Sequence, residues 1–209
     1  MTIVELQFPV IGAAIPADHG YALYGALAHH LATLHADGNG LAIAPINGQY
    51  SGNNQFALNV RSSRLRFRLP DDRIASLLPL AGKALDVAGH KLRLGVPTVQ
   101  ALTPAPSLVA RLVTIKGFKE PSPFLEAARR QLDALEIRGE IGIPRIAAGP
   151  HAGEPRRRIL RIKDKKVVGF ALRVTELTAD ESLRLQEHGI GGRRKMGCGF
   201  FVPLRARSP

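Results

Sequence analysis

The chain has 209 residues, of which 45% are hydrophobic, so it is long enough to form one large domain or two small ones with packed cores. Lysine and arginine number 29 against 17 acidic residues, and the net charge of +12 favours a polyanionic partner, nucleic acid before an anionic membrane. The single cysteine, Cys198, excludes an internal disulfide and a cysteine-based zinc cluster. We find no secretory signal and no run of about 20 apolar residues, so no membrane partner is expected and the location is expected to be cytoplasmic.

The first half of the chain predicts elements in the order β-α-β-β-α-β, with additions. A strand is expected over residues 2–12, followed by a helix from His19 to Leu34 with Asp18 as its N-cap. Basic and apolar residues alternate over 64–69, which predicts a strand with one cationic face. The remaining expected elements are strands over 41–46, 56–60, 83–87, 91–94 and 96–102, a polar turn over 47–54 and a short helix over 71–80.

The second half repeats this order of elements without repeating the sequence. The expected elements are strands over 108–115 and 137–143, a helix over 123–135, a hairpin of 157–162 with 167–174, a helix from about 178 and a strand over 200–204. We therefore predict an α+β chain of two tandem ferredoxin-like (β-α-β-β-α-β, RRM-like) domains with a C-terminal glycine-rich loop. The expected domains are 1–102 and 108–209, joined by the linker 103–107, Thr-Pro-Ala-Pro-Ser.

The most informative motif lies in that C-terminal loop. Two Gly-apolar-Gly units, 189–191 and 197–199, flank five residues that include three cations. Glycine permits positive φ and close approach of another backbone, and successive N–H groups can form a concave anion site. Arginine adds a planar fork that suits phosphate oxygens. The loop therefore predicts a phosphate backbone held against a sheet.

A second basic segment, residues 156–166, holds seven cations and one acid. Strand alternation would place Arg157, Arg161 and Lys163 outward, with isoleucine and leucine inward. Taken alone, such a segment is slightly better explained as a solvated strand face. Beside a basic glycine-rich loop and a net charge of +12, a groove that follows a phosphate backbone is the better interpretation.

The loop resembles the signature of the CRISPR-associated repeat-processing endoribonucleases, which belong to a repeat-associated superfamily of ferredoxin-like RNA-binding proteins. The match is complete: Gly189-Ile190-Gly191, five residues, then Gly197-Cys198-Gly199. The segment from Ile15 to Tyr21 and the Thr33-Leu34-His35 sequence that ends the expected helix are also similar to that family. The resemblance covers both ends of the chain and is strongest to a short myxobacterial-type subtype.

The resemblance implies cleavage of CRISPR precursor RNA within its repeats, without a metal or a cofactor. The 2′-hydroxyl attacks the phosphate and leaves a 2′,3′-cyclic phosphate. The expected partners are repeat RNA and the CRISPR effector complex that receives the product; a non-catalytic subunit that binds this RNA is the alternative. The residues expected to bind RNA are Gly189, Gly191, Gly192, Arg193, Arg194, Lys195, Gly197, Gly199, Arg156, Arg157, Arg158 and Arg161.

Histidine suits the proton transfers of this reaction because its charge changes near pH 6.5. His35 matches the catalytic position of the family, and His19 matches its helix-entry histidine, where a structural role is expected. On a helical wheel His29 points into solvent and His30 is half-buried, and both remain alternatives. Where some relatives hold a catalytic tyrosine this chain has Ala28, so the second catalytic group stays open among Lys195, Arg194 and Ser182.

A small phosphate-ester enzyme that uses the glycine-rich loop to hold a nucleotide is a further alternative. It predicts saturable binding of a mononucleotide with little dependence on salt. Binding of repeat RNA should instead weaken steeply as salt is added.

Overall fold

The computed structural model describes residues 1–31, 34 and 40–204. The chain divides into two compact units: one comprises Met1–Ala101 with Lys195–Gly197, and the other comprises Leu102–Arg194 and the chain from Cys198 onward. Three residues of the glycine-rich loop thus group with the first unit. The order of elements along the sequence does not indicate that this short segment belongs to the first unit. The expected domain limits at residues 102 and 108 stay a prediction.

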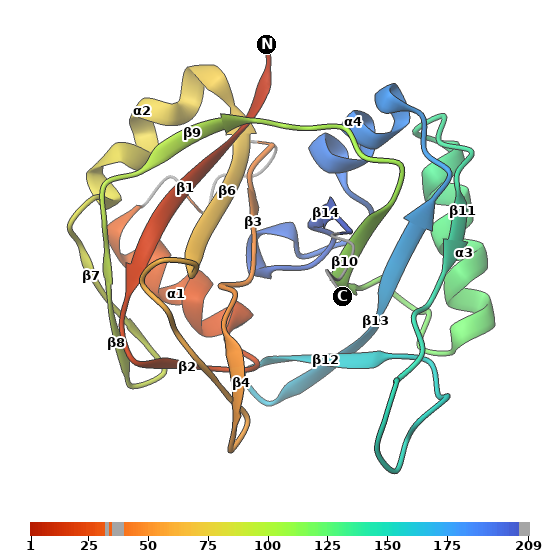
Figure 1. Cartoon of the computed structure of the whole chain (residues 1–209), viewed down its shortest axis with the longest axis horizontal. Helices are drawn as coiled ribbons and strands as arrows, with labels where there is room; N and C mark the ends of the chain where they lie inside the picture. The colour runs from red at the N-terminus through yellow and green to blue at the C-terminus, as the bar shows by residue number, and fades with distance from the viewer. Residues whose placement is uncertain (32–33, 35–39, 205–209) are drawn as a thin grey trace. The chain divides into compact units, whose positions relative to one another are not determined.

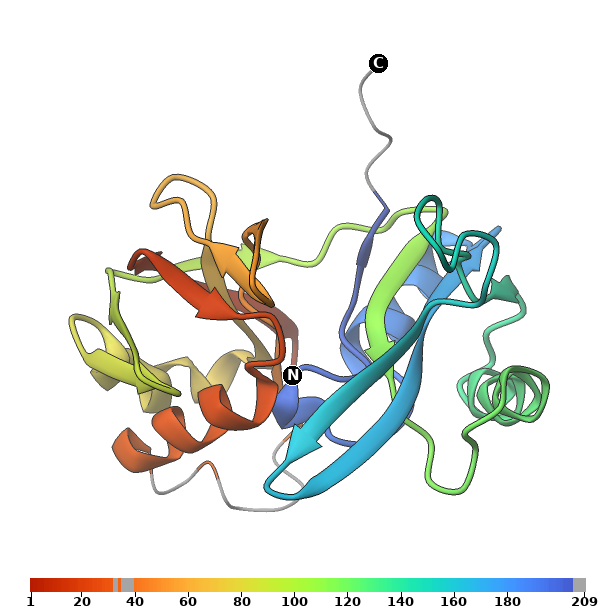
Figure 2. The same cartoon turned by 90° about the horizontal axis from the view of Figure 1, so that it is seen from below.

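The main sheet of the first unit has a ferredoxin-like arrangement (Figure 1). Its strands run in the order β3-β6-β1-β8-β7, with β9 also paired to β1, and all these pairs are antiparallel. Helices α1 (Gly20–His30) and α2 (Ile74–Leu77) lie on the same side of β1 and β6 (Figure 2). The strands are β1 (Ile3–Ile11), β3 (Ala42–Ile43), β6 (Arg64–Pro70), β7 (Ala84–Val87), β8 (His90–Leu94) and β9 (Thr98–Ala101).

A small second sheet is inserted into this unit. Its strands β2 (Ala14–Pro16), β5 (Gln55–Ala57) and β4 (Gln49–Gly52) are antiparallel. The expected polar turn over 47–54 is therefore wrong over Gln49–Gly52, which form a strand, whereas Asn53 and Asn54 do form a turn. The expected helix over 71–80 is reduced to the single turn α2 between two 3₁₀ turns. Pro79 lies at the start of the second of these turns, where its missing N–H prevents continuation of an α-helix.

Helix α1 is shorter than its apolar pattern predicts. It begins at Gly20 with His19 as the N-cap residue, so the expected N-cap at Asp18 is wrong. Leu23 and Leu27 are buried on the helix, and the buried set continues with Leu31 and Leu34 beyond its end. The apolar pattern is therefore longer than the helix, because Leu31 and Leu34 are buried in the same core although they follow the last helical residue.

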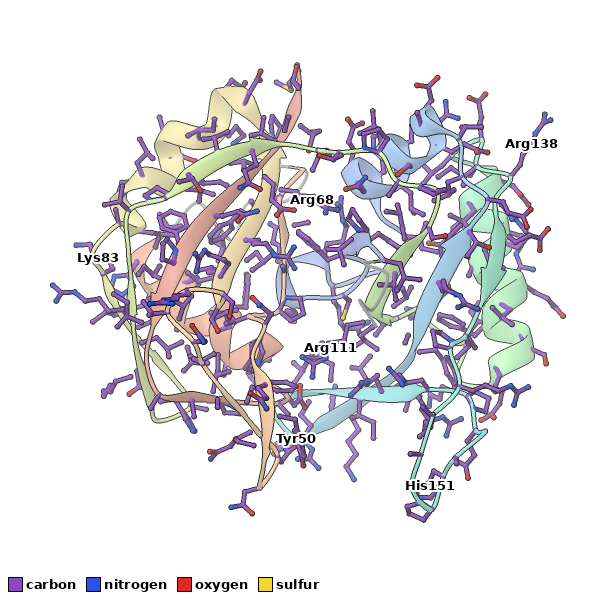
Figure 3. The ribbon with its side chains drawn as sticks, viewed as in Figure 1. Tyr50, Arg68, Lys83, Arg111, Arg138 and His151 are labelled. Atoms are coloured by element: carbon purple, nitrogen blue, oxygen red, sulfur yellow. The ribbon has the colours of Figure 1, made fainter. Side chains whose placement is uncertain are left out.

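The alternating strand β6 does not present a free cationic face. Arg68 is 1% exposed, and its Nε donates to Glu5 Oε2 at 3.1 Å (Figure 3). Arg66 Nη1 lies 3.6 Å from Glu5 Oε1 on the neighbouring strand, and Arg64 donates to three backbone carbonyls of the preceding loop. A buried cation requires a paired anion, and Glu5, 63 positions away, supplies it. The cationic face expected from the alternation is therefore wrong.

The second unit repeats the ferredoxin-like arrangement. Its strands run in the order β11-β13-β10-β14, all antiparallel, and β12 pairs with β13. Residues of helices α3 and α4, such as Phe124 and Leu185, share one buried core with Ala110 of β10 and Leu172 of β13. The predicted fold class is thus confirmed for both halves. The elements are β10 (Leu108–Val113), α3 (Pro121–Asp133), β11 (Glu140–Gly142), β12 (Arg157–Ile162), β13 (Lys165–Thr175), α4 (Ala179–His188) and β14 (Phe201–Pro203).

Helix α4, which leads into the glycine-rich loop, begins with a capping box. Thr178 Oγ1 accepts from the Glu181 N–H, and Glu181 Oε2 accepts from the Thr178 N–H at 2.9 Å. The same carboxylate accepts from the Arg138 N–H at 2.6 Å, and it is buried. The Arg138 bond, followed by the Thr178 bond, lowers the pKa of Glu181.

Replacement of Glu181 with glutamine is expected to destabilise the protein by about 1 kcal/mol at neutral pH, because the amide caps two backbone N–H groups less well than a carboxylate does. The lowered pKa of Glu181 in the folded state means that its stabilisation is present above its unfolded pKa of about 4.3 and is lost as the pH falls through the folded value. Urea unfolding at several pH values measures this. A difference between the two proteins that stays constant down to pH 3 would contradict it.

Candidate nucleic-acid interface

The glycine-rich loop follows α4 and is fixed by backbone hydrogen bonds within the second unit. Its N–H groups at Gly191, Gly192 and Gly199 donate to Gln131 Oε1 (2.7 Å), Thr114 O (2.9 Å) and Leu112 O (2.8 Å). The Gly189 N–H donates to Leu185 O at the end of α4. Because these four amides already have acceptors in the protein, the expected row of free N–H groups for an anion is wrong at these positions.

The two Gly-apolar-Gly units pack against each other. A Cβ atom on Gly189 would lie 2.3 Å from Gly199 O, and one on Gly199 would lie 2.3 Å from Ile190 O. Both glycines also have left-handed φ, +58° and +64°. Any other residue would displace backbone here, so these glycines serve the fold of the loop rather than an approach of RNA.

Two of the other three loop glycines are also closely packed, and the third is not. A Cβ atom on Gly191 would lie 2.6 Å from Thr114 O, and one on Gly197 would lie 2.9 Å from Pro45 Cγ. Gly192 is different because it is exposed and a Cβ atom there would meet nothing within 4 Å. Of the five glycines expected to bind RNA, Gly192 has the space for a ligand.

The three loop cations have different surroundings. Arg193 is exposed and holds a left-handed φ of +63°. Arg194 turns back toward α4: its Nη2 donates to Glu187 O at 2.7 Å, and burial lowers its pKa to about 10, so it remains charged at neutral pH. Lys195 Nζ donates to Leu34 O at 2.9 Å within the first unit. Leu34 immediately precedes His35 in the sequence.

Four arginines lie on the helix-free face of the second sheet, here called the arginine face. Arg158 pairs with Gly169 and Arg173 pairs with Val109. On β13 and β10 the residues that alternate with these partners, such as Phe170, Leu172 and Ala110, face the core shared with the helices. Arg111 on β10 follows the core residue Ala110 and so belongs to the same face (Figure 3). Arg111 and Arg173 were not among the residues expected to bind RNA, although alternation with apolar neighbours in the sequence could have indicated them. The arginine face comprises Arg111, Arg156, Arg158 and Arg173.

Arg158 is an electrostatically unfavourable residue in the isolated protein. Burial is the main cause that lowers its pKa, and the charge of Arg156 adds to the effect. Its Nε is buried and has no hydrogen-bond partner in the described part of the chain. A partly buried guanidinium beside a second cation is stabilised by an anion that accepts its hydrogen bonds. The arginine face is therefore chemically suited to bind phosphate.

The other arginines of β12 lie on the opposite face. Arg157 Nη2 donates to Lys119 O at 2.7 Å and to Glu120 Oε1 at 3.1 Å, and its guanidinium lies over the Phe170 ring. Arg161 is exposed. The expected outward direction of both is confirmed, but Ile159 shares that face and is also exposed, so the expectation that isoleucine points inward is wrong there. The strand thus separates Arg156 and Arg158 from Arg157 and Arg161.

The structure places His19 in a structural position. Its side chain is 1% exposed, its Nδ1–H donates to Pro16 O at 2.7 Å, and its Nε2 accepts from the Ile46 N–H at 2.9 Å. These bonds fix the tautomer and occupy both ring nitrogens. As a neutral buried ring that joins the end of β2 to the segment after β3, His19 cannot exchange a proton with a substrate in this conformation.

The other candidate histidines lie at and after the end of α1. His29 is exposed as expected, whereas His30 is exposed rather than half-buried, and its Nε2 lies 3.2 Å from Ala84 O. The rings of these two histidines are 5.4 Å apart, edge to face. His35 lies outside the described residues.

Ser182, one of the expected auxiliary groups, is fully buried in α4. Its Oγ accepts from the Ala105 N–H at 2.9 Å and from Gln186 Nε2 at 3.3 Å. The hydroxyl therefore joins α4 to the chain that enters the second unit, and its proposed catalytic role is wrong. In the described ranges we find no group of three histidine, cysteine or acidic side chains arranged to hold a metal, and no helix long and apolar enough to cross a bilayer.

Comparison with known proteins gives a consistent result. The family described as "Cas6 Crispr" matches residues 4–206. The chain is 43% identical over 203 residues to the protein named CRISPR-associated endonuclease Cas6 of Myxococcus xanthus (strain DK1622), which covers 97% of this chain and 82% of that protein.

Solved structures share the fold at low sequence identity. A Cas6-related protein from Pyrococcus furiosus superimposes with a TM-score of 0.68 at 9% identity over 98% of this chain and 100% of the other. A structure titled "An RAMP protein binding different RNA substrates" gives 0.65 at 9% identity over the same shares.

Proposed function

The chain belongs to the Cas6 family, and on that premise we propose that it is a metal-independent endoribonuclease that cuts CRISPR precursor RNA within its repeats. The observation that carries the proposal is the 43% identity, over nearly the whole chain, to a CRISPR-associated endonuclease. The net charge of +12 and the partly buried, unpaired Arg158 independently favour a phosphate-rich ligand.

The proposed reaction is an internal transesterification. The 2′-hydroxyl gives its proton to a base and attacks the adjacent phosphorus, a bond forms from O2′ to phosphorus, and the bond to O5′ breaks. The leaving O5′ takes a proton from an acid, so the products end in a 2′,3′-cyclic phosphate and a 5′-hydroxyl. Histidine fits the acid or base role, and a cation that faces the phosphate would stabilise the developing negative charge.

We assign the proton transfer to His35, and we assign Lys195 to the charge on the phosphate. The Lys195 ammonium group is held at the carbonyl of Leu34, the residue that precedes His35 in the sequence, so its anchor lies next to the proposed base along the chain. His29 is the alternative base because it is exposed at the end of α1. Arg193 and the arginine face would bind the RNA backbone away from the cut.

The test uses purified protein and 5′-labelled RNA of the CRISPR repeat from the host genome, with and without EDTA. Cleavage in EDTA, with an upstream product that acid treatment converts from a cyclic to an open phosphate, is the expected result. Binding without cutting would establish the alternative, a non-catalytic RNA-binding subunit. Failure to bind repeat RNA, with saturable mononucleotide binding instead, would overturn the assignment.

Replacement of Arg158 with glutamine is expected to weaken binding of repeat RNA and to reduce the slope of log Kd against log salt by about 1, because one phosphate contact is lost. The same change removes a desolvated, unpaired cation, so the free energy of unfolding should not fall. Filter binding at several salt concentrations and urea unfolding measure the two effects.

Arg157→Gln is the matched control for this prediction, since Arg157 lies on the opposite face of the same strand and already has carbonyl and carboxylate partners. Arg157→Gln should therefore change the slope of log Kd against log salt less than Arg158→Gln does. Equal slopes for Arg158→Gln and the unchanged protein would show that the arginine face does not contact phosphate.

A further inference from the structure

The hairpin of β4 and β5 presents its tip in a fixed conformation. Its two strands are joined by a two-residue turn, Asn53-Asn54, and both residues hold left-handed φ values of +47° and +56°. Two successive left-handed residues are typical of the type I′ turn, whose twist matches that of the flanking strands. Pairing of β5 with β2 ties the hairpin to the rest of the first unit.

Tyr50 is the most exposed of the phenylalanines and tyrosines in the described ranges, at 63%, and it lies on this hairpin (Figure 3). Its ring meets the Phe56 ring edge to face, with centroids 6.0 Å apart and an interplanar angle of 74°. Phe56 in turn packs against the core of the first unit. Because one aromatic contact holds the tyrosine ring while most of its surface remains open, the ring is ready to stack on a flat ligand.

The hairpin is also free of charge in a strongly basic protein. No charged residue occurs between positions 41 and 60, although the net charge of the chain is +12. Gln49, Asn53 and Asn54 are exposed, and their side chains make no hydrogen bond within the described part of the chain. Each amide group offers both donors and an acceptor, which can match the polar edge of a nucleobase.

We propose that this hairpin binds an unpaired nucleobase of the RNA, with Tyr50 stacked on the base and the neighbouring amides bonded to its edge. The proposal rests on the proposed function and extends it to a specificity site. Single-stranded RNA is commonly recognised through bases stacked on aromatic rings and hydrogen-bonded along their edges. A phosphate is the wrong ligand because the hairpin has no cation, and one ring offers too little apolar area for a protein interface.

The test places 2-aminopurine in turn at each unpaired nucleotide of the host repeat RNA and measures fluorescence and Kd. Quenching by the unchanged protein is expected at one position. Tyr50→Ala should remove this quenching and weaken binding roughly 5- to 150-fold, the range measured for loss of one stacked base. Tyr50→Phe should retain both the quenching and the affinity. The salt slope should be the same in all three proteins, because no phosphate contact changes.

Val60→Ala, which shortens another exposed apolar side chain of the same unit, is the matched control and should change neither signal. If Tyr50→Ala binds and quenches like the unchanged protein, the hairpin does not bind a base, and the inference fails while the proposed function stands. That result would also be obtained if the hairpin docks another protein. If the unchanged protein binds no repeat RNA, the proposed function fails, and this inference fails with it.

Discussion

Replacement of His35 with alanine is expected to slow cleavage of repeat RNA by about 10²–10⁴-fold while binding of that RNA remains unchanged. The physical reason is that the imidazole moves a proton in the transition state but contributes no charge that the RNA backbone needs for binding. Single-turnover cleavage of labelled RNA gives the rate, and filter binding gives the Kd. The loss should be equal with and without EDTA, because no metal takes part in the proposed reaction.

His29→Ala and His151→Ala are the controls for this experiment. His29 tests the alternative base, and His151 is an exposed histidine in the second unit, paired at 3.1 Å with Glu154. Both variants should cleave at the unchanged rate. Retained cleavage in His35→Ala together with a loss in His29→Ala would transfer the catalytic role to the end of α1. Retained cleavage in both would leave His30 as the candidate base at the end of α1, since His19 has no ring nitrogen available.

The secondary structure could be predicted well where burial follows a regular period. The strand over 2–12 was evident because its apolar residues alternate, and α1 was evident because leucines recur at helical spacing. Element ends were less predictable. His19 rather than Asp18 is the N-cap residue of α1, and its ring bonds to Pro16 O and to the Ile46 N–H instead of to the helix. A pattern of residue types along one segment does not contain such contacts.

The charges of the candidate site could be counted from the sequence but not assigned to partners. Arg68 and Arg158 each lie in a strand that carries three arginines. Glu5 neutralises Arg68 from a strand far away in the sequence, whereas the charged neighbour that lowers the pKa of Arg158 is another cation, Arg156. Which arginine remains available for RNA therefore depends on strand pairing. The glycine-rich motif was located correctly, but most of its glycines pack against protein backbone.

Replacement of Gly199 with alanine is expected to destabilise the protein by about 3 kcal/mol or more and to abolish cleavage. A left-handed backbone costs a non-glycine residue about 1–3 kcal/mol, and the new Cβ atom would also lie 2.3 Å from Ile190 O, which forces the carbonyl to move. That movement would disturb the loop that carries Arg193 and Lys195. Urea unfolding of the full chain measures the stability, and the cleavage assay measures the function.

Gly192→Ala is the matched control because it makes the same chemical change in the same motif, at a glycine without left-handed φ and with open space around its Cβ position. It should fold with unchanged stability, and any effect should fall on RNA binding alone. The two variants therefore separate glycines that shape the loop from one that faces the ligand. Equal stability of both variants, with equal loss of RNA binding, would mean that the Gly-apolar-Gly units contact the RNA directly, contrary to the packing described above.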